Sequence, residues 1–287
     1  MMTNTTFLII AALLPAIILC IYVFIKDRAE KEPIGLLLKL LLFGAISCLP
    51  ASLGEEFLFS IIDKSFARSI YLNEAGQAVM TSSNYYLYQF MLAFVGVALV
   101  EEFCKWFFLT KSTKNDKNFN CLFDGLIYAI FVSLGFAALE NVIYVLNGGL
   151  QVAVLRAILS VPGHMFFGVM MGYHYSLWHI TDKANSLEKS LKATGHINRF
   201  TPEFSSTKDK WLCLLIPVLA HGFYDYCCFI GSPTMTIVLY VFVLFMYIHC
   251  FRKIRNMSKN DASNIGYAKA MLIQKYPTLG EYIRNEL

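Results

Sequence analysis

The stretch FMLAFVGVALVEEFCKWFFL, from Phe90 to Leu109, decides the fold of this chain. It has the length and the apolar character of a helix that crosses a bilayer, which takes about 20 residues. It nevertheless carries Glu101, Glu102 and Lys105 well inside the apolar run. An ionisable side chain at bilayer depth costs about 2.5–3.5 kcal/mol on insertion scales, so it persists only beside a partner or a wet cavity. The stretch therefore predicts a transmembrane helix that contributes to a buried polar site.

The composition of the whole chain also indicates a membrane protein. Of its 287 residues, 57% are hydrophobic and 15% are charged, whereas a soluble domain has about 25% charged residues. The lipid bilayer is therefore the expected surroundings, and a net charge of +4 gives no indication of a nucleic-acid partner. Most of the eight cysteines lie in apolar segments and none forms a C-x-x-C pair, which argues against a disulfide framework or a cysteine zinc site.

The apolar segments predict an all-α polytopic bundle of about seven transmembrane helices. The predicted spans are Thr6–Ile25, Ile34–Leu53, Tyr88–Leu109, Leu122–Leu146, Val152–Leu177, Trp211–Ile230 and Thr234–Phe251. Two short segments, Asn147–Gly149 and Gly231–Pro233, predict tight turns between neighbouring spans. The long stretch between the second and third spans, Gly54–Tyr86, is polar enough to lie at the outer surface.

The distribution of lysine and arginine predicts the orientation. These residues gather in alternate connecting segments and in the tail, and cytoplasmic loops carry such an excess. We therefore expect the N-terminus outside and the C-terminus in the cytoplasm. The expected domains are a seven-span domain over residues 1–255, with a cytoplasmic loop at 181–210, and a polar cytoplasmic tail over residues 256–287.

Three further predicted spans also carry ionisable residues. These residues are Glu140 in GFAALEN, His164 in VPGHMFFG, and His221 with Asp225 in AHGFYDY. His221 and Asp225 are four residues apart, as are Glu101 and Lys105, so each pair shares one helix face. At 1.5 Å of rise per residue, the depths of all these groups are compatible with one buried cluster.

This combination of buried carboxylates and histidines suits hydrolysis. One carboxylate can act as a general base on water, and histidines with a carboxylate can hold a divalent metal that acidifies the water. The soluble zincin motif H-E-x-x-H is absent from the sequence. The residue types alone leave three alternatives open: a membrane hydrolase, a proton or cation transporter, and a non-catalytic protein that keeps the cluster for packing.

Three motifs in chain order resemble those of the PrsW-type intramembrane proteases. Glu101–Lys105 matches E-E-x-x-K, Phe136–Glu140 matches F-x-x-x-E, and His221–Asp225 matches H-x-x-x-D. His164 matches a further histidine of that family, and Glu32–Pro33 is also similar. The distantly similar CAAX prenyl protease and Abi group has an arginine after the glutamates, F-x-x-x-H and often H-x-x-x-N. The residues at these positions here favour the PrsW-like branch.

The resemblance implies a site-1-type protease in the bacterial cell membrane. Its substrate would be a single-span, membrane-anchored anti-sigma factor that is cut outside the cytoplasm. Such a cut is the first step of regulated proteolysis, which releases an extracytoplasmic-function sigma factor in a stress response. A CAAX-protease-like or immunity-type membrane endopeptidase remains an alternative.

The resemblance also implies a role for each site residue. Glu101 would activate water, and Glu140 would assist it or bind metal. His164 and His221 would be metal ligands or electrophilic donors, with Asp225 orienting His221. The implied ligand set is thus Glu140, His164 and His221, with zinc as the expected divalent metal and a metal-free glutamate mechanism as the alternative.

The remaining two residues of the first motif are expected to act nearby. Lys105 would be an electrostatic partner of the carboxylates. Glu102 would be the second catalytic carboxylate, although its side chain leaves the helix about 100° away from that of Glu101.

A second Glu-Glu pair, Glu55 and Glu56, lies at the outer end of the second predicted span. The residue four positions after Glu55 is Phe59, so no lysine completes the motif. We expect water to solvate this pair and assign it no catalytic role.

Overall fold

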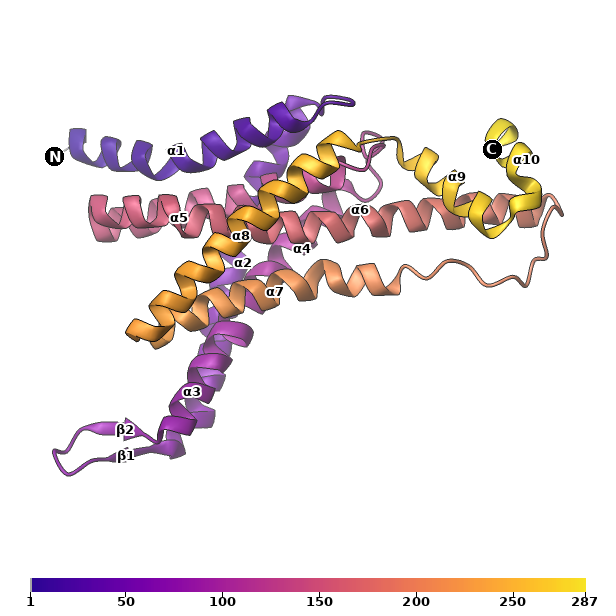
Figure 1. Ribbon diagram of the computed structural model, residues 1–287. Coiled ribbons are helices and arrows are strands. Elements are labelled where there is room, and N and C mark those ends of the chain that lie inside the picture. The colour runs from indigo at the N-terminus through magenta and orange to yellow at the C-terminus, as the bar shows by residue number, and fades with distance from the viewer. Residues whose placement is uncertain (1) are drawn as a thin grey trace.

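The computed structural model describes residues 2–287, with side chains from residue 5 onward. The α-helices are α1 (Met2–Lys26), α2 (Ile34–Phe66), α3 (Ser82–Phe90), α4 (Leu99–Thr113), α5 (Asp124–Ile158), α6 (Ser160–Ala193), α7 (Thr207–Ile230), α8 (Pro233–Lys259), α9 (Asn264–Lys275) and α10 (Gly280–Glu286). The π-helix η2 (Met91–Ala98) and the 3-10 helices η1 (Ala67–Ser69) and η3 (Pro277–Leu279) complete the helical elements of the described chain. One antiparallel hairpin, β1 (Ile70–Leu72) with β2 (Ala78–Met80), projects from the bundle (Figure 1).

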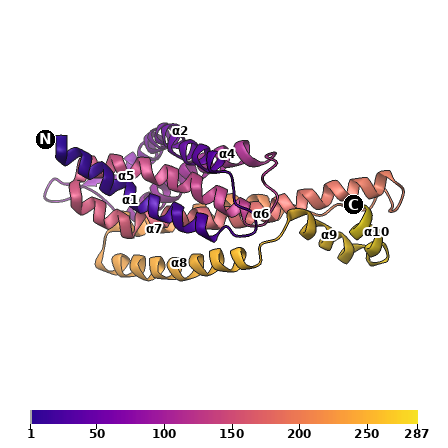
Figure 2. The same ribbon diagram turned by 90° about the horizontal axis from the view of Figure 1, so that it is seen from above.

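The long helices α5 and α6 form the centre of the molecule. Residues 124–137 of α5 are all buried, and α5 packs against α1, α2 and α6. Seen from above, α2 and α4 lie at one side of α5 and α6, and α8 lies at the other (Figure 2). Because neighbours surround α5, its sequence is apolar on every face rather than amphipathic.

Two glycines allow α2 and α5 to lie in close contact. A Cβ atom at Gly44 would lie 1.9 Å from the carbonyl oxygen of Val132, and one at Gly135 would lie 2.0 Å from that of Leu41. Small residues let membrane helices approach at backbone distance. The contact fixes the depth of α2 beside the part of α5 that carries Glu140.

Five helices are long and apolar enough to cross a membrane, among the residues that the structure describes. They are Thr5–Lys26, Ile34–Ser69, Asp124–Ala193, Thr207–Ile230 and Pro233–Lys259. The chain is therefore an all-α polytopic membrane bundle, as predicted. The segment with Glu101, Glu102 and Lys105 is not among the five, and the predicted fourth and fifth spans fall within one of them. The number of seven spans and the orientation thus stay predictions.

The turn predicted at Asn147–Gly149 is present. Gly149 has φ +72° and interrupts the helix, and a short helical segment, residues 150–158, follows it. A second interruption at Leu159 then separates this segment from α6. The predicted span Val152–Leu177 is therefore divided, a feature that its continuous apolar pattern did not indicate.

The outer stretch that follows the second predicted span is more helical than expected. Helix α2 continues to Phe66, so only residues 67–81 separate it from α3. The cause lies in apolar residues at helical spacing: Phe59 and Ile62 both reach Gly96 of η2. This contact holds the outer half of α2 against the helix that carries the glutamates.

The cytoplasmic loop and tail predicted from the sequence also contain regular structure. Helix α6 continues to Ala193, and α9 and α10 fold back onto its end (Figure 1). Leu191, Leu272 and Ile283 form a small apolar core there. Buried Glu188 accepts hydrogen bonds from Lys275 and from the Tyr276 hydroxyl group.

Candidate active site

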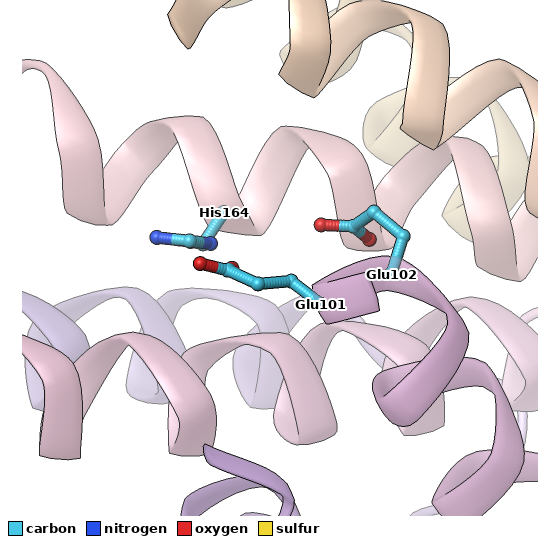
Figure 3. Close-up of side chains that lie close together, drawn as sticks. All are labelled: Glu101, Glu102 and His164. Atoms are coloured by element: carbon cyan, nitrogen blue, oxygen red, sulfur yellow. The ribbon is translucent and has the colours of Figure 1, made fainter. Parts of the chain in front are cut away.

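A π-helical stretch leads directly to the two glutamates of the first motif. Helix η2 ends at Ala98, so Glu101 and Glu102 lie in the first turn of α4. Turns of π-helix are rare and occur frequently at functional sites. Figure 3 shows the two side chains leaving this turn in different directions, with the Glu101 carboxylate beside the ring of His164.

Lys105 lies at the centre of the polar cluster. Its Nζ atom donates to Glu101 Oε2 at 3.0 Å, to Glu102 Oε1 at 2.8 Å and to His164 Nδ1 at 3.1 Å. An ammonium group has three hydrogens, and here each one has an acceptor. The same Nζ lies 4.1 Å from the centre of the Phe136 ring. The lysine is fully buried and joins α4 to α6.

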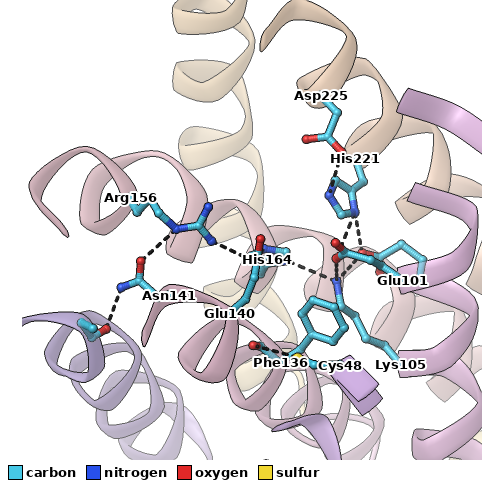
Figure 4. Close-up of polar contacts among 12 residues, drawn as sticks. Cys48, Glu101, Lys105, Phe136, Glu140, Asn141, Arg156, His164, His221 and Asp225 are labelled. Atoms are coloured by element: carbon cyan, nitrogen blue, oxygen red, sulfur yellow. Dashed lines mark hydrogen bonds and ion pairs between the residues drawn. The ribbon is translucent and has the colours of Figure 1, made fainter. Parts of the chain in front are cut away.

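The contact with Lys105 determines the tautomer of His164. Because an ammonium group can only donate, Nδ1 of His164 must accept, and Nε2 carries the hydrogen. Nε2 lies 2.9 Å from Glu140 Oε2 and donates to it. The carboxylate of Glu140 on α5 is thus connected through His164 to the glutamates of α4 (Figure 4).

His221 extends the network to α7. Its Nδ1 lies 2.9 Å from Glu102 Oε1, and its Nε2 lies 3.3 Å from Asp225 Oδ2. The ring of Phe167 stacks on the imidazole with a centroid distance of 4.7 Å. Two carboxylates and one aromatic face therefore fix the ring of His221 in one orientation.

The structure thus brings together all seven residues predicted for the site. They are Glu101, Glu102, Lys105, Glu140, His164, His221 and Asp225, contributed by α4, α5, α6 and α7. Their catalytic and ligand roles stay predictions.

The cluster borders a cavity of about 610 Å³, a size within the range of small-molecule sites, roughly 300–1,000 Å³. Five of the seven residues line it: Glu101, Glu140, His164, His221 and Asp225. Glu102 and Lys105 are fully buried and do not belong to this lining. A molecule that enters the cavity therefore meets Glu101, whereas Glu102 and Lys105 act from behind it.

The expectation for the second Glu-Glu pair needs correction for one of its members. Glu55 is half-buried and lines the same cavity, whereas Glu56 is exposed as expected. The sequence did contain a signal for this placement. Cys48, Ser52, Glu55 and Phe59 recur at helical spacing, and all four line the cavity, because α2 continues past the predicted end of its span.

Sequence reasoning also missed the role of Arg156. Arg156 lines the cavity, and its Nη2 lies 2.8 Å from Glu140 Oε2. No helical pattern indicates this contact, because the interruption at Gly149 turns the chain back toward Glu140.

Glu32, which is similar to the family pattern, lies outside this site. It is buried before α2, where its Oε2 accepts from the Tyr128 hydroxyl group at 2.7 Å. Burial raises the pKa of Glu32 to about 7. Its main-chain N–H donates to Asp27, so Glu32 stabilises the connection between α1 and α2.

One group of buried side chains fits a metal ion, among the residues from 2 to 287. Ligand atoms of Glu101, Glu102 and His164 all lie within 4.8 Å of one another. Glu102 Oε2 is buried without a hydrogen-bond partner in the described chain, so this oxygen is available to bind a metal ion. Carboxylate oxygens and imidazole nitrogen are common zinc ligands. The set fits a divalent ion if Lys105, bonded to the same three residues, gives up at least one contact.

This convergent set differs from the ligand set that the resemblance implied. The two have only His164 in common. Glu140 contacts the opposite nitrogen of the His164 ring, and the ring centres of His164 and His221 are 5.4 Å apart. The set Glu140, His164 and His221 therefore stays a prediction.

A polytopic bundle with buried glutamates and histidines around a cavity fits an intramembrane hydrolase. The family model described as "PrsW family intramembrane metalloprotease" matches residues 32–250. The chain belongs to this family, and the resemblance noted from the motifs is confirmed.

Curated relatives agree with the family match. Protease PrsW of Oceanobacillus iheyensis is 29% identical over 259 residues, which cover 88% of this chain and 97% of the relative. Protease PrsW of Clostridioides difficile is 28% identical over 245 residues, 84% of this chain and 87% of the relative. That of Bacillus subtilis is 29% identical over 219 residues, 76% and 81% of the respective chains. No solved structure matches. The chain is thus an intramembrane protease of the bacterial cell membrane, with a membrane protein as substrate.

Proposed function

We propose that this protease cleaves a single-span, membrane-anchored anti-sigma factor on the outer side of the membrane. The cut would be the first step in releasing an extracytoplasmic-function sigma factor. The substrate class rests on the motif resemblance, and the proteolytic chemistry rests on one observation above all. Glu101 faces the cavity while a buried lysine holds one of its oxygens at 3.0 Å.

Glu101 is the proposed general base. Its carboxylate would accept a proton from a water in the cavity, whose oxygen attacks the scissile carbonyl carbon. The same carboxyl group would then give the proton to the departing amide nitrogen. Lys105 holds Glu101 Oε2 in position, and its contact with Phe136 helps to keep the ammonium group fixed.

The two histidines are proposed to act at the developing oxyanion. Both line the cavity beside Glu101. A ring N–H that turns from its carboxylate partner to the oxyanion would stabilise the charge as it develops. His221 is held by Glu102 and Asp225, and His164 is held by Lys105 and Glu140. Each ring is thus oriented before a substrate arrives.

A divalent metal, for which zinc is the proposed identity, would be held by Glu101, Glu102 and His164 once Lys105 gives up at least one of its contacts with them. When bound there, it would supply Lewis-acid polarisation of the scissile carbonyl and acidify the water. The convergence of these three ligand sites and the spare oxygen of Glu102 support this set.

The decisive experiment is co-expression with a single-span anti-sigma factor, followed by immunoblotting for the cleaved form. Glu101→Gln removes the base with little change in volume and should abolish cleavage. Glu56→Gln is the matched control, because Glu56 is the exposed neighbour in the second pair, and it should cleave like the wild type. Equal cleavage by Glu101→Gln and the wild type would sink the proposal.

We also propose the seven-span arrangement with the N-terminus outside. The domain of residues 1–255 would hold the site, and the tail of residues 256–287 would lie in the cytoplasm. Labelling of single cysteines by a membrane-impermeant maleimide tests this. A cysteine at Glu74 should react in intact cells, and one at Glu281 should react only after lysis.

A further inference from the structure

The short helical segment after Gly149 holds a cation against the site. Arg156 Nη2 lies 2.8 Å from Glu140 Oε2, and the two side chains are only 15% and 19% exposed. We propose that Arg156 is a positioning residue for Glu140, and that residues 150–158 belong to the active-site architecture. The inference rests on the proposed function of the same site.

One oxygen of Glu140 receives two contacts. Its Oε2 atom lies 2.9 Å from His164 Nε2 and 2.8 Å from Arg156 Nη2. Hydrogen bonds and ion pairs with a charged partner at low exposure restrict a carboxylate far more than surface pairs do. Arg156 and His164 together thus select one rotamer of Glu140 out of those that the cavity would allow.

Arg156 is itself held at a second nitrogen. Its Nε donates to Asn141 Oδ1 at 2.9 Å, and Asn141 Nδ2 donates to the carbonyl oxygen of Ala12 at 2.7 Å (Figure 4). Only one orientation of the Asn141 amide satisfies both contacts, because the carbonyl oxygen of Ala12 requires a donor. The guanidinium group also lies 4.2 Å from the centre of the Tyr144 ring.

These contacts require arginine rather than any positive charge. The planar guanidinium presents Nε and Nη2 at a fixed separation, whereas lysine offers a single nitrogen at the end of a flexible stem. A lysine could reach Glu140 or Asn141 but would not hold both in the same geometry. Replacement of Arg156 by lysine would therefore keep the positive charge beside Glu140 and lose the fixed orientation.

The position of Glu140 matters beyond its own carboxylate. By accepting from Nε2 of His164, Glu140 stabilises the tautomer whose Nδ1 accepts from Lys105. Lys105 in turn holds Glu101. Arg156 therefore acts on the proposed base through three intermediate side chains, Glu140, His164 and Lys105.

The test uses the full-length enzyme in liposomes with a single-span substrate, and measures kcat and KM separately. Arg156→Ala should lower kcat by about 100-fold, the order expected when catalytic groups are displaced by about 1 Å, and should change KM less than threefold. Arg156→Lys should lose about tenfold in kcat. Arg68→Ala, an exposed arginine beyond α2, is the control and should behave like the wild type.

Added guanidinium tests whether Arg156 positions Glu140, because a variant that is only misfolded would not regain kcat when the cation is added. Millimolar guanidinium should restore part of the kcat of Arg156→Ala, because the cation can occupy the vacated space beside Glu140, and should not improve Arg68→Ala. A wild-type kcat for Arg156→Ala overturns the inference. The inference also fails if guanidinium does not restore the kcat of Arg156→Ala and both Arg156→Ala and Arg156→Lys show a large fall in melting temperature.

A parallel measurement of Glu101→Gln separates this inference from the proposed function. If Glu101→Gln remains active, the assignment of the base fails, whatever Arg156 does. If Glu101→Gln is inactive while Arg156→Ala keeps the wild-type kcat, only the positioning role of Arg156 fails.

Discussion

Replacement of Lys105 by methionine should destabilise the folded protein strongly. The side chain is fully buried, and its Nζ lies 3.0 Å from one carboxylate and 2.8 Å from the other. At an effective dielectric constant of about 20, each attraction is worth about 6 kcal/mol before desolvation is counted. Methionine has a similar volume, so the substitution removes the charge and leaves little empty space.

The size of the effect depends on which carboxylate water can reach. Glu101 lines the cavity, so water can replace part of its contact with the lysine. Glu102 is fully buried and keeps only the ring of His221 as a partner. Leaving one charge of a buried pair alone costs about 3–5 kcal/mol. For a large domain this corresponds to a fall of roughly 6–20 °C in melting temperature, at about 2–4 °C per kcal/mol.

The assay is thermal unfolding of the purified protein in detergent, with Lys111→Met as the control. Lys111 is exposed on the same helix, and its replacement should leave the melting temperature unchanged. The double variant Lys105→Met with Glu102→Gln also removes the unpaired charge of Glu102 and should recover at least half of the fall in melting temperature. The reasoning is refuted if Lys105→Met melts within about 2 °C of the wild type, or if Glu102→Gln worsens it further.

Three further predictions concern the metal, the acidic connection between α1 and α2, and the contact between α2 and α5. Elemental analysis should find that Glu102→Gln loses bound zinc while Glu140→Gln keeps it, and the opposite pattern would favour the ligand set implied by the resemblance. Because burial raises the pKa of Glu32 to about 7 from about 4.3 in an unfolded chain, the folded state binds the extra proton between these values. Stability from this group is therefore full below about pH 4 and falls as pH rises to about 7, so Glu32→Gln should raise the melting temperature more at pH 8 than at pH 5. An equal gain at both values would contradict this sign. Gly135→Ala places a Cβ 2.0 Å from the Leu41 carbonyl oxygen and should destabilise the protein by about 1–3 kcal/mol, whereas Gly35→Ala, with nothing within 4 Å, should not, and thermal unfolding of both variants checks this.

The sequence predicted the parts of this molecule that regular helices determine. Apolar runs located the helices, and spacings of four residues placed Glu101 with Lys105 and His221 with Asp225 on common faces. The depths of the charged residues were compatible with one cluster, in which each finds the partner that bilayer depth favours. Helical spacing and the cost of a charge at bilayer depth can both be assessed from one sequence.

The features that the sequence did not reveal depend on where helices are interrupted or continue. Arg156 reaches Glu140 because Gly149 adopts φ +72°, and an Asn-Gly-Gly turn does not specify the direction of the segment after it. Glu55 lines the cavity because α2 continues past the predicted boundary. Boundaries of apolar segments are set by packing against distant residues such as Gly96, and hydropathy contains no information about that contact.

The geometry of the E-E-x-x-K motif explains why it contains two glutamates. Adjacent helix residues point about 100° apart, so Glu101 can face the cavity only if Glu102 faces the interior. One lysine can hold both, because Lys105 follows them by four and three positions and lies on the turn above. Glu101 is thus available to a substrate, while Glu102 orients His221 from the buried side. Neither glutamate can take the place of the other, because the two side chains point in different directions. Glu101→Gln should therefore remove the base, and Glu102→Gln should remove the group that orients His221.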